Sequence, residues 1–396
     1  MERKREINLF THKYILTPGP TEMPRELLLS ILKDVTNPDL DPQFYDFYHG
    51  IFQKLARIFE SWNHRALILL GEGMLGLESS VVNMLNRGEK GLVFSNGFFG
   101  DGFSDLIEMT DRKAIKCRWN EREAIPPEEA IEAISRNNEA SAVYMVHCET
   151  PTGILNPIDK IGPAISETGK LFIVDAVSSM FTLPIKAEEW GIDILIGGSQ
   201  KALNLPPGLT ILLISNNAWR RALSVEPNSF YLSFKVWEGF LENKESMPPY
   251  TLSMNLLRAL DDSLANILRE GEDTVYSRHS KIREASWSAA IALGLEPFPK
   301  KIEDSCPGVT AILMPEGISS IEAANWIYNN YGVMLGIGLG NFRDRILRIG
   351  HMGFTASIDY IILTYTALGN YLVSKGIASK TDISEALEAI FRILNG

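Results

Sequence analysis

Three residues that follow or lie within apolar runs have side chains suited to chemistry at a carbonyl or an amine. Lys201 comes after such a run and two glycines, and a proline-rich apolar stretch follows it. A lysine partly removed from water has a lowered pKa, and its neutral amine can form a Schiff base. Asp175 directly follows four apolar residues, and a carboxylate there can keep a heteroaromatic ring nitrogen protonated. Arg348 has a guanidinium group that pairs bidentately with one carboxylate.

A glycine-rich turn adds a possible anion site. The run GEGMLG at residues 71–76 follows an apolar run and precedes a helical pattern. Backbone N–H groups in such a turn can bind an anion, helped by the helix N-terminus. The run also matches the dinucleotide-binding fingerprint, which requires an acidic residue after the next strand. This sequence has Ser95, Asn96 and Gly97 there, which disfavours a nicotinamide dehydrogenase, and a tight turn without a ligand remains an alternative.

The combination of these features is more informative than any one of them. Singly, Lys201 would be read as a solvated lysine, Asp175 as a helix cap and Arg348 as half of a salt bridge. Together, an amine, a carboxylate and an anion-binding turn are what pyridoxal phosphate needs for its aldehyde, its ring nitrogen and its phosphate. Neither a metal-ligand spacing nor a serine-hydrolase motif is present. The sequence therefore predicts pyridoxal 5'-phosphate as cofactor and no metal site.

Alternating segments must position these residues. Between residues 66 and 215, short apolar runs rich in branched side chains alternate with helical patterns. This predicts a mostly parallel sheet covered by helices, with ligands at the carboxyl ends of its strands. The expected strands are residues 66–70, 91–95, 114–117, 142–147, 171–175, 192–196 and 210–215, and the expected helices are 77–86, 127–135 and 157–168.

The pattern changes after about residue 255 to that of a smaller α+β domain. A helical stretch at 256–293 has Gly271 as a possible break, and strands at 309–314 and 346–349 accompany helices at 320–331 and 357–394. We predict an α/β fold with an N-terminal segment at residues 1–20, a large cofactor-binding domain at 21–265 and a small C-terminal domain at 266–396.

Composition excludes several classes. The 396 residues include 38 Lys and Arg against 49 Asp and Glu, and the only dense basic cluster is residues 3–5, so we expect no nucleic-acid partner. No apolar run approaches the roughly 18–20 residues of a membrane span. The three cysteines form no disulfide framework or zinc pattern, and no apolar stretch follows the N-terminal charges as in a secretory signal. We therefore expect a cytoplasmic protein without a membrane partner.

Blocks along nearly the whole chain resemble the class V, fold-type-I aminotransferases of the alanine–glyoxylate and serine–pyruvate group. They are LTPGPT (16–21), GEGMLGLE (71–78), SNGFFG (95–100), ETPTG (149–153), VDAVSS (174–179), GSQKALN (198–204), PPG (206–208), SFYL (229–232) and LRIGHMG (347–353). The SQKA block with VDAVS upstream is highly specific. The resemblance implies transfer of an amino group from a small amino acid, with alanine or serine favoured, to a 2-oxo acid such as glyoxylate or pyruvate.

The resemblance also implies roles for individual residues. Lys201 forms the imine with the cofactor, Asp175 pairs with the pyridine nitrogen, and Arg348 holds the substrate carboxylate. The other implied cofactor-binding residues are Gly73, Met74 and Gln200 at the phosphate, Phe99 on the ring face, Thr150 at the phenolic oxygen, and Thr251. Relatives extend the matching threonine across from the second subunit, so we expect a homodimer with shared active sites.

Two departures from the family pattern bear on the substrate. Glu72 stands where many relatives have serine, and Met74 replaces a histidine. An acidic group beside a phosphate is unfavourable, so we expect Glu72 to face the substrate or to be paired. Glu72 and the RIGHMG run are also similar to pyridoxamine–pyruvate aminotransferases. The second active-site arginine of those enzymes falls on Leu339, which argues against pyridoxamine, although a shifted alignment would bring Arg343 or Arg345 there.

The cross-subunit contact and the reaction class have open alternatives. Tyr250 is close to the place of a tyrosine that relatives extend across the dimer, but Pro248 occupies the aligned position. A cysteine desulfurase or related lyase would need a mobile reactive cysteine, for which Cys306 is the candidate. A non-catalytic protein that binds pyridoxal phosphate on the same scaffold would have less use for Arg348.

Overall fold

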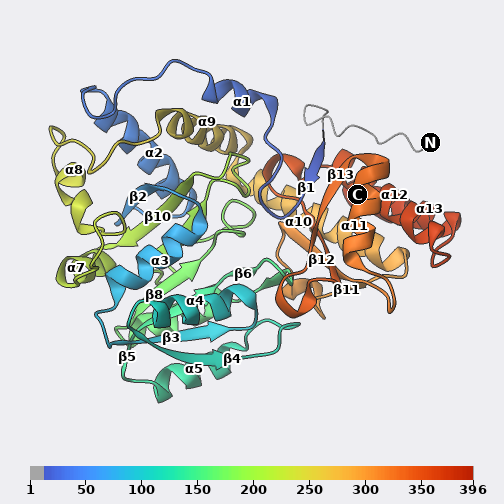
Figure 1. The fold of residues 1–396 in the computed structure, drawn as a ribbon, viewed down its shortest axis with the longest axis horizontal. Coiled ribbons are helices and arrows are strands. Elements are labelled where there is room, and N and C mark those ends of the chain that lie inside the picture. Colours follow the sequence, from blue (N-terminus) through green and yellow to red (C-terminus); the bar gives the residue numbers. More distant parts are fainter. Residues whose placement is uncertain (1–12, 396) are drawn as a thin grey trace, which may run out of the picture.

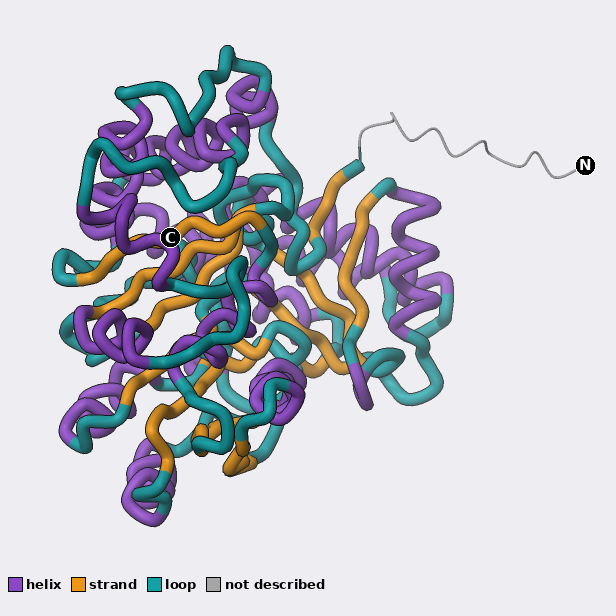
Figure 2. Tube along the Cα trace, turned by 60° about the vertical axis from the view of Figure 1, so that its left-hand side comes forward, coloured by secondary structure: helices purple, strands orange, loops and turns teal. Residues whose placement is uncertain are grey.

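The computed structural model describes residues 13–395 and contains a large sheet and a smaller one, each covered by helices (Figures 1 and 2). The seven-stranded large sheet has the order β2-β10-β9-β8-β5-β3-β4. Its strands are β2 (His64–Leu70), β3 (Lys90–Ser95), β4 (Lys113–Arg118), β5 (Ala140–Val146), β8 (Leu171–Asp175), β9 (Ile194–Gly198) and β10 (Leu209–Ser215). Only β10 runs opposite to its neighbours β2 and β9. The prediction of a mostly parallel sheet is therefore confirmed.

Helices connect these parallel strands. They are α3 (Gly73–Met84), α4 (Phe98–Met109), α5 (Pro127–Arg136) and α6 (Ile158–Glu167). The inner strands β5, β8 and β9 are almost entirely buried, as expected for strands covered on both faces. The prediction that the first helix starts at residue 77 was wrong, because α3 already begins at Gly73, where the Glu72 side chain caps it.

Further helices and a short hairpin complete the large-sheet region. The helices are α1 (Arg25–Ile31), α2 (Phe44–Ile58), α7 (Asn216–Ser224), α8 (Glu238–Glu242) and α9 (Met254–Glu270). The hairpin pairs β6 (Cys148–Glu149) with β7 (Ile154–Leu155). Short 3₁₀ turns lie at Lys235–Trp237, Ile302–Asp304, Gly340–Phe342 and Gly353–Thr355. Within residues 13–395, no helix combines the length and apolar character needed to cross a bilayer.

The smaller sheet has five strands in the order β1-β13-β14-β12-β11. These are β1 (Tyr14–Leu16), β11 (Glu296–Pro297), β12 (Val309–Leu313), β13 (Val333–Ile337) and β14 (Ile346–Gly350), and the helices around them are α10 (Glu272–Ala292), α11 (Ser320–Tyr331), α12 (Ile358–Ser374) and α13 (Lys380–Asn395). Strands β1 and β13 were not predicted from the sequence. The N-terminal strand β1 pairs in parallel with β13, so both ends of the described chain contribute to this region (Figure 1).

Two main apolar cores correspond to the two sheets. The larger core includes most of the buried side chains of α9, whereas the smaller one begins in α10 at Ile282 and includes Leu16. The expected break at Gly271 is confirmed, because this residue separates α9 from α10 with a φ of 89°. The predicted boundary at 265/266 falls inside α9, and the domain limits stay a prediction. Residues 1–12, with the basic cluster at 3–5, lie outside the described residues.

Candidate active site

Most of the predicted site residues follow parallel strands of the large sheet. Asp175 is the last residue of β8, and Lys201 comes shortly after β9. Phe99 lies in the first turn of α4, directly after β3, and Thr150 follows β6. Because carboxyl ends of parallel strands meet at one edge of a sheet, the fold gathers these side chains.

The amine of Lys201 lies against the N-terminal segment. Its Nζ donates a hydrogen bond to the carbonyl oxygen of Pro18 at 2.5 Å. Burial lowers the pKa of Lys201 to about 8, and the positive charge of Arg348 contributes in the same direction. A substantial fraction of this amine is therefore neutral near pH 8, as a nucleophile or proton acceptor requires.

The carboxylate of Asp175 is almost fully buried, with 6% of its surface exposed. Its Oδ1 accepts a hydrogen bond from the backbone N–H of Val177 at 2.9 Å. Burial raises the pKa of Asp175 to about 6, although this hydrogen bond and the charge of Lys201 act against that rise. Asp175 is thus negatively charged at neutral pH, and its charge is poorly solvated and available to a cationic partner.

Thr150 and Arg348 meet between the two sheets. The Thr150 hydroxyl lies 2.6 Å from the hydroxyl of Ser178, and either can be the donor. Arg348, in the middle of β14, donates from Nη1 to the Thr150 carbonyl at 3.3 Å and from Nε to the Ile337 carbonyl at 2.7 Å. Burial lowers the pKa of Arg348 to about 10, so the guanidinium stays charged at neutral pH.

The turn before α3 contains a carboxylate that is paired. Glu72 caps α3, and its Oε1 accepts a hydrogen bond from the backbone N–H of Met74 at 3.2 Å. Its Oε2 accepts from Nε2 of Gln200 at 3.3 Å. Both carboxylate oxygens of Glu72 are thus hydrogen-bonded within the chain, and its expected role towards substrate stays a prediction. Gly73 is the first residue of α3 and is buried, and Met74 is partly exposed.

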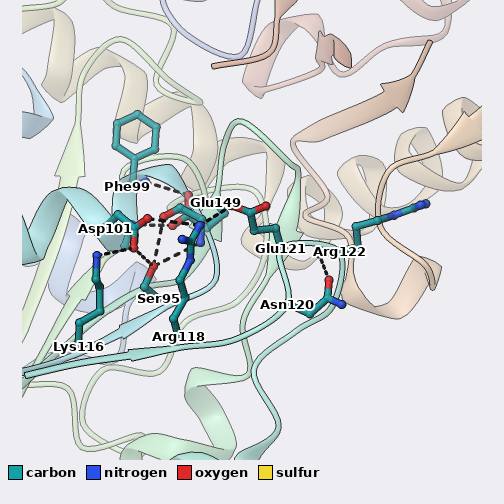
Figure 3. Close-up of polar contacts among 11 residues, drawn as sticks. Ser95, Phe99, Asp101, Lys116, Arg118, Asn120, Glu121, Arg122 and Glu149 are labelled. Carbon is teal, nitrogen blue, oxygen red and sulfur yellow. Dashed lines mark hydrogen bonds and ion pairs between the residues drawn. The ribbon is translucent and has the colours of Figure 1, made fainter. Parts of the chain in front are cut away.

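Phe99 and Thr251 have different surroundings. The Phe99 ring packs edge-on against Phe98 with 5.4 Å between ring centroids, and its backbone N–H bonds to Glu149 (Figure 3). Thr251 is exposed and precedes α9, and its hydroxyl donates to Oδ2 of Asp39 at 3.2 Å. Within residues 13–395 of this single chain, no hydrogen bond links Thr251 to the other predicted site residues.

Three residues of this region have roles that the sequence analysis did not predict. Pro18, Ser178 and Glu149 contact Lys201, Thr150 and Phe99, respectively. All three lie inside blocks that carry the family resemblance, which was the one signal that could have drawn attention to them. Their contacts join segments distant in sequence, so no local spacing indicates them.

Cys306 does not have the surroundings expected of a mobile reactive cysteine. Its side chain is completely buried, and its Sγ lies 3.9 Å from the carbonyl oxygen of Ser178. Exposure and thiolate character are what make a cysteine reactive. This burial disfavours the desulfurase alternative.

Comparisons with known proteins identify the family of this chain. The family model "Aminotransferase class-V" matches residues 107–243. The chain is 31% identical over 382 residues to pyridoxamine–pyruvate transaminase of Mesorhizobium japonicum, covering 96% of each chain. It is 32% identical to serine–glyoxylate aminotransferase of Methylorubrum extorquens over 86% of each. The crystal structure of pyridoxamine–pyruvate aminotransferase from Mesorhizobium loti superposes with a TM-score of 0.91 at 30% identity over 96% of both chains.

The chemistry of the site and the similarity to known proteins both indicate one family. An amine of lowered pKa, a buried carboxylate and a guanidinium group surround the edge of the sheet, an arrangement suited to chemistry at the Cα of an amino acid. The similarity extends over nearly the whole chain and includes both sheets. The chain therefore belongs to the class V aminotransferases and is a transaminase.

Proposed function

We propose that this transaminase uses pyridoxal 5'-phosphate to move an amino group from a small amino acid, with alanine or serine favoured, to glyoxylate or pyruvate. The observation that carries the proposal is the placement of Arg348 beside Thr150, on the same side as Lys201, whose pKa it lowers. A carboxylate-binding group next to a nucleophilic amine is what an amino acid substrate requires.

The residues of this edge fit the ring of the proposed cofactor. The Lys201 amine suits its aldehyde, the buried Asp175 carboxylate suits a protonated ring nitrogen, and the Thr150 hydroxyl suits the phenolic oxygen. Backbone N–H groups at the start of α3 suit an anion. The Glu72 carboxylate adds a negative charge at the same turn, so the phosphate end is the less favourable part of the fit.

In the proposed mechanism, each residue has a defined task. When bound, pyridoxal phosphate supplies an aldehyde that accepts the amino group and a ring that withdraws electrons. Arg348 binds the substrate carboxylate and so orients the Cα–H bond towards Lys201. The neutral amine of Lys201 removes the Cα proton, which its lowered pKa permits. Asp175 keeps a proton on the ring nitrogen by its negative charge.

A second candidate amino donor is pyridoxamine, as in the name of one relative. Glu72 favours pyridoxamine, which has a neutral hydroxymethyl group where pyridoxal phosphate has its phosphate. The negative charge of Glu72 repels a phosphate but not a hydroxymethyl group. Leu339 disfavours it, because this residue stands where a second arginine is expected. The alternative positions Arg343 and Arg345 are exposed.

The proposed active site is shared between two subunits. Thr251 is exposed in the single chain, and Tyr250 beside it is half-buried. Tyr250 stacks on Tyr231 with 4.4 Å between ring centroids. These features support a homodimer in which this segment faces the partner. Light scattering tests the mass, and a Thr251→Ala variant should bind pyridoxal phosphate more weakly.

The cytoplasmic location stays a prediction from cysteine usage.

A donor panel tests the proposed reaction. Alanine, serine, aspartate, 2-aminoethylphosphonate and pyridoxamine are each offered with glyoxylate or pyruvate, and the amino acid product is measured. We expect alanine or serine to be the most active donors. If L-alanine and L-serine leave the visible spectrum of the loaded protein unchanged, they are not its amino donors.

A further inference from the structure

The carboxylate of Glu149 is fully buried at the first turn of α4. Its Oε2 accepts a hydrogen bond from the backbone N–H of Phe99 at 3.1 Å, and its Oε1 accepts from that of Gly100 at 2.6 Å (Figure 3). We propose that Glu149 is a positioning residue that holds Phe99 in place relative to Thr150. This inference rests on the proposed function and on the family resemblance, which implies that Phe99 lies on the face of the cofactor ring.

Helix α4 has no side-chain cap of its own. Its N-cap residue is Gly97, which has no side chain to accept a hydrogen bond from the first turn. The first N–H groups of a helix need acceptors, and the positive end of the helix dipole favours a negative charge. Glu149, about fifty residues further along the chain, meets both needs. The first turn of α4 is thereby fixed to β6, in addition to the hydrogen bond that the Ser95 hydroxyl donates to Oδ1 of Asp101 at 2.8 Å.

The space for this carboxylate depends on Gly97. A Cβ atom at this position would lie 2.6 Å from the carboxyl carbon of Glu149. The backbone of Gly97 is extended, with a φ of −178°, so any residue could adopt its conformation. Glycine is therefore required by the close approach of Glu149 and not by the backbone angles.

Within residues 13–395, Glu149 has no cationic side chain as a partner and is stabilised by N–H groups of α4 instead. Asp101, in the first turn of α4, is paired with Lys116 and Arg118 at 3.3 and 3.4 Å (Figure 3). Among the described residues, no lysine or arginine pairs with Glu149 in the same way. Burial raises the pKa of Glu149 to about 7, so part of it is ionised at neutral pH, and the two N–H groups and the helix N-terminus stabilise that ionised form. Loss of that charge should therefore loosen the first turn of α4.

The main chain of Glu149 holds the other side of the pocket. Its carbonyl oxygen accepts hydrogen bonds from the N–H groups of Gly153 at 2.7 Å and Thr152 at 3.2 Å. These close the turn that contains Thr150, the residue whose hydroxyl bonds Ser178. One residue thus fixes two groups that the proposed function assigns to the cofactor: its side chain holds Phe99, and its main chain holds Thr150.

A double-mutant cycle tests the inference by cofactor affinity. The dissociation constant of pyridoxal 5'-phosphate is measured by fluorescence for the full-length protein and for Glu149→Gln, Phe99→Ala and the double variant. The amide keeps the shape of the side chain but removes its charge and turns a donor towards one N–H group. We expect Glu149→Gln to weaken binding about tenfold alone and less than twofold in the Phe99→Ala background. An equal loss in both backgrounds, or no loss in the first, overturns the inference.

Two controls separate positioning from general stability. Ser319→Ala removes the cap of α11, whose first-turn N–H at Glu322 bonds the Ser319 hydroxyl at 3.1 Å. It should lower the melting temperature without changing cofactor affinity. If Glu149→Gln does not fold, Glu149→Asp replaces it in the same cycle. Aspartate keeps the carboxylate, but its side chain is one methylene shorter, so the carboxylate lies further from the N–H groups of Phe99 and Gly100. Failure of the wild-type protein to bind pyridoxal phosphate would contradict the proposed function itself, which is a separate outcome.

Discussion

Arg348 donates a hydrogen bond from Nη1 to the carbonyl oxygen of Thr150 at 3.3 Å. Arg348 belongs to the small sheet, whereas Thr150 follows β6 beside the large one. This contact brings the group proposed to bind substrate to the residue proposed to bind cofactor. The two sheets therefore share one site, and the following predictions concern the residues around it.

Lys201 should be indispensable for turnover. Replacing it with alanine removes the amine that takes the Cα proton, so we expect kcat to fall by about a thousandfold or more. The visible absorbance of the bound cofactor should also be lost. Steady-state kinetics and an absorbance spectrum check both. The surface variant Lys186→Ala is the control and should behave like the wild type, and retained turnover in Lys201→Ala would refute the assigned role.

Capture of the cofactor should depend on pH through Lys201. Because burial lowers the pKa of this amine to about 8, it is mostly protonated and unreactive below that value. The rate of pyridoxal phosphate binding to the cofactor-free protein should rise with pH, with its midpoint near pH 8. Stopped-flow absorbance measures it. In Arg348→Leu the midpoint should move to higher pH, because a nearby positive charge that disfavours protonation is removed; an unchanged midpoint would contradict this.

Asp175 should stabilise the loaded protein but destabilise the cofactor-free protein. Its pKa rises from 3.8 to about 6 on folding, so its contribution to stability is present below pH 3.8 and is lost as the pH rises through 6. At pH 8 the ionised group costs about 3 kcal/mol of unfolding free energy. Asp175→Asn should therefore raise the melting temperature of the cofactor-free protein at pH 8, with a smaller gain at pH 5.

The same Asp175→Asn variant should lower kcat by about a hundredfold or more, because the neutral amide cannot keep the ring nitrogen protonated. Asp159→Asn, in an exposed part of α6, is the matched control for both measurements. A variant that kept full activity would show that another group supplies the charge.

Arg348→Lys should weaken binding of the amino acid rather than of the cofactor. Lysine keeps the charge but lacks the planar pair of N–H groups that fits a carboxylate. We expect KM for the amino donor to rise about a hundredfold, with the dissociation constant of pyridoxal phosphate changed by less than about threefold. Arg220→Lys, on the exposed surface of α7, should change neither quantity. A selective loss of cofactor affinity would point instead to a role at the ring.

Glu72→Gln should change the preference between phosphorylated and unphosphorylated cofactor. The amide keeps an oxygen for the N–H of Met74 but removes the negative charge from the turn. We expect pyridoxal phosphate to bind about tenfold more tightly, while binding of pyridoxal changes little. Equilibrium titration of both compounds measures the ratio. An equal change for both would mean that Glu72 does not face the phosphate end.

The sequence by itself determined the large sheet, because most of its strands contain a short apolar run bounded by turn residues. The strand ending at Asp175 and the break at Gly271 lie where their local patterns indicate. Strands β1 and β13 were missed. A three-residue edge strand has almost no periodicity, and its partner lies more than three hundred residues away.

Only the tertiary structure decided how the site is assembled. The Lys201–Pro18, Arg348–Thr150 and Glu149–Phe99 contacts each join separate segments through a backbone carbonyl or N–H group. Every residue has such groups, so residue type carries no signal of these partners. The sequence determines which side chains are present. Their pKa values depend on burial and on nearby charges from distant segments, and only folding produces that burial and those contacts around Lys201 and Asp175.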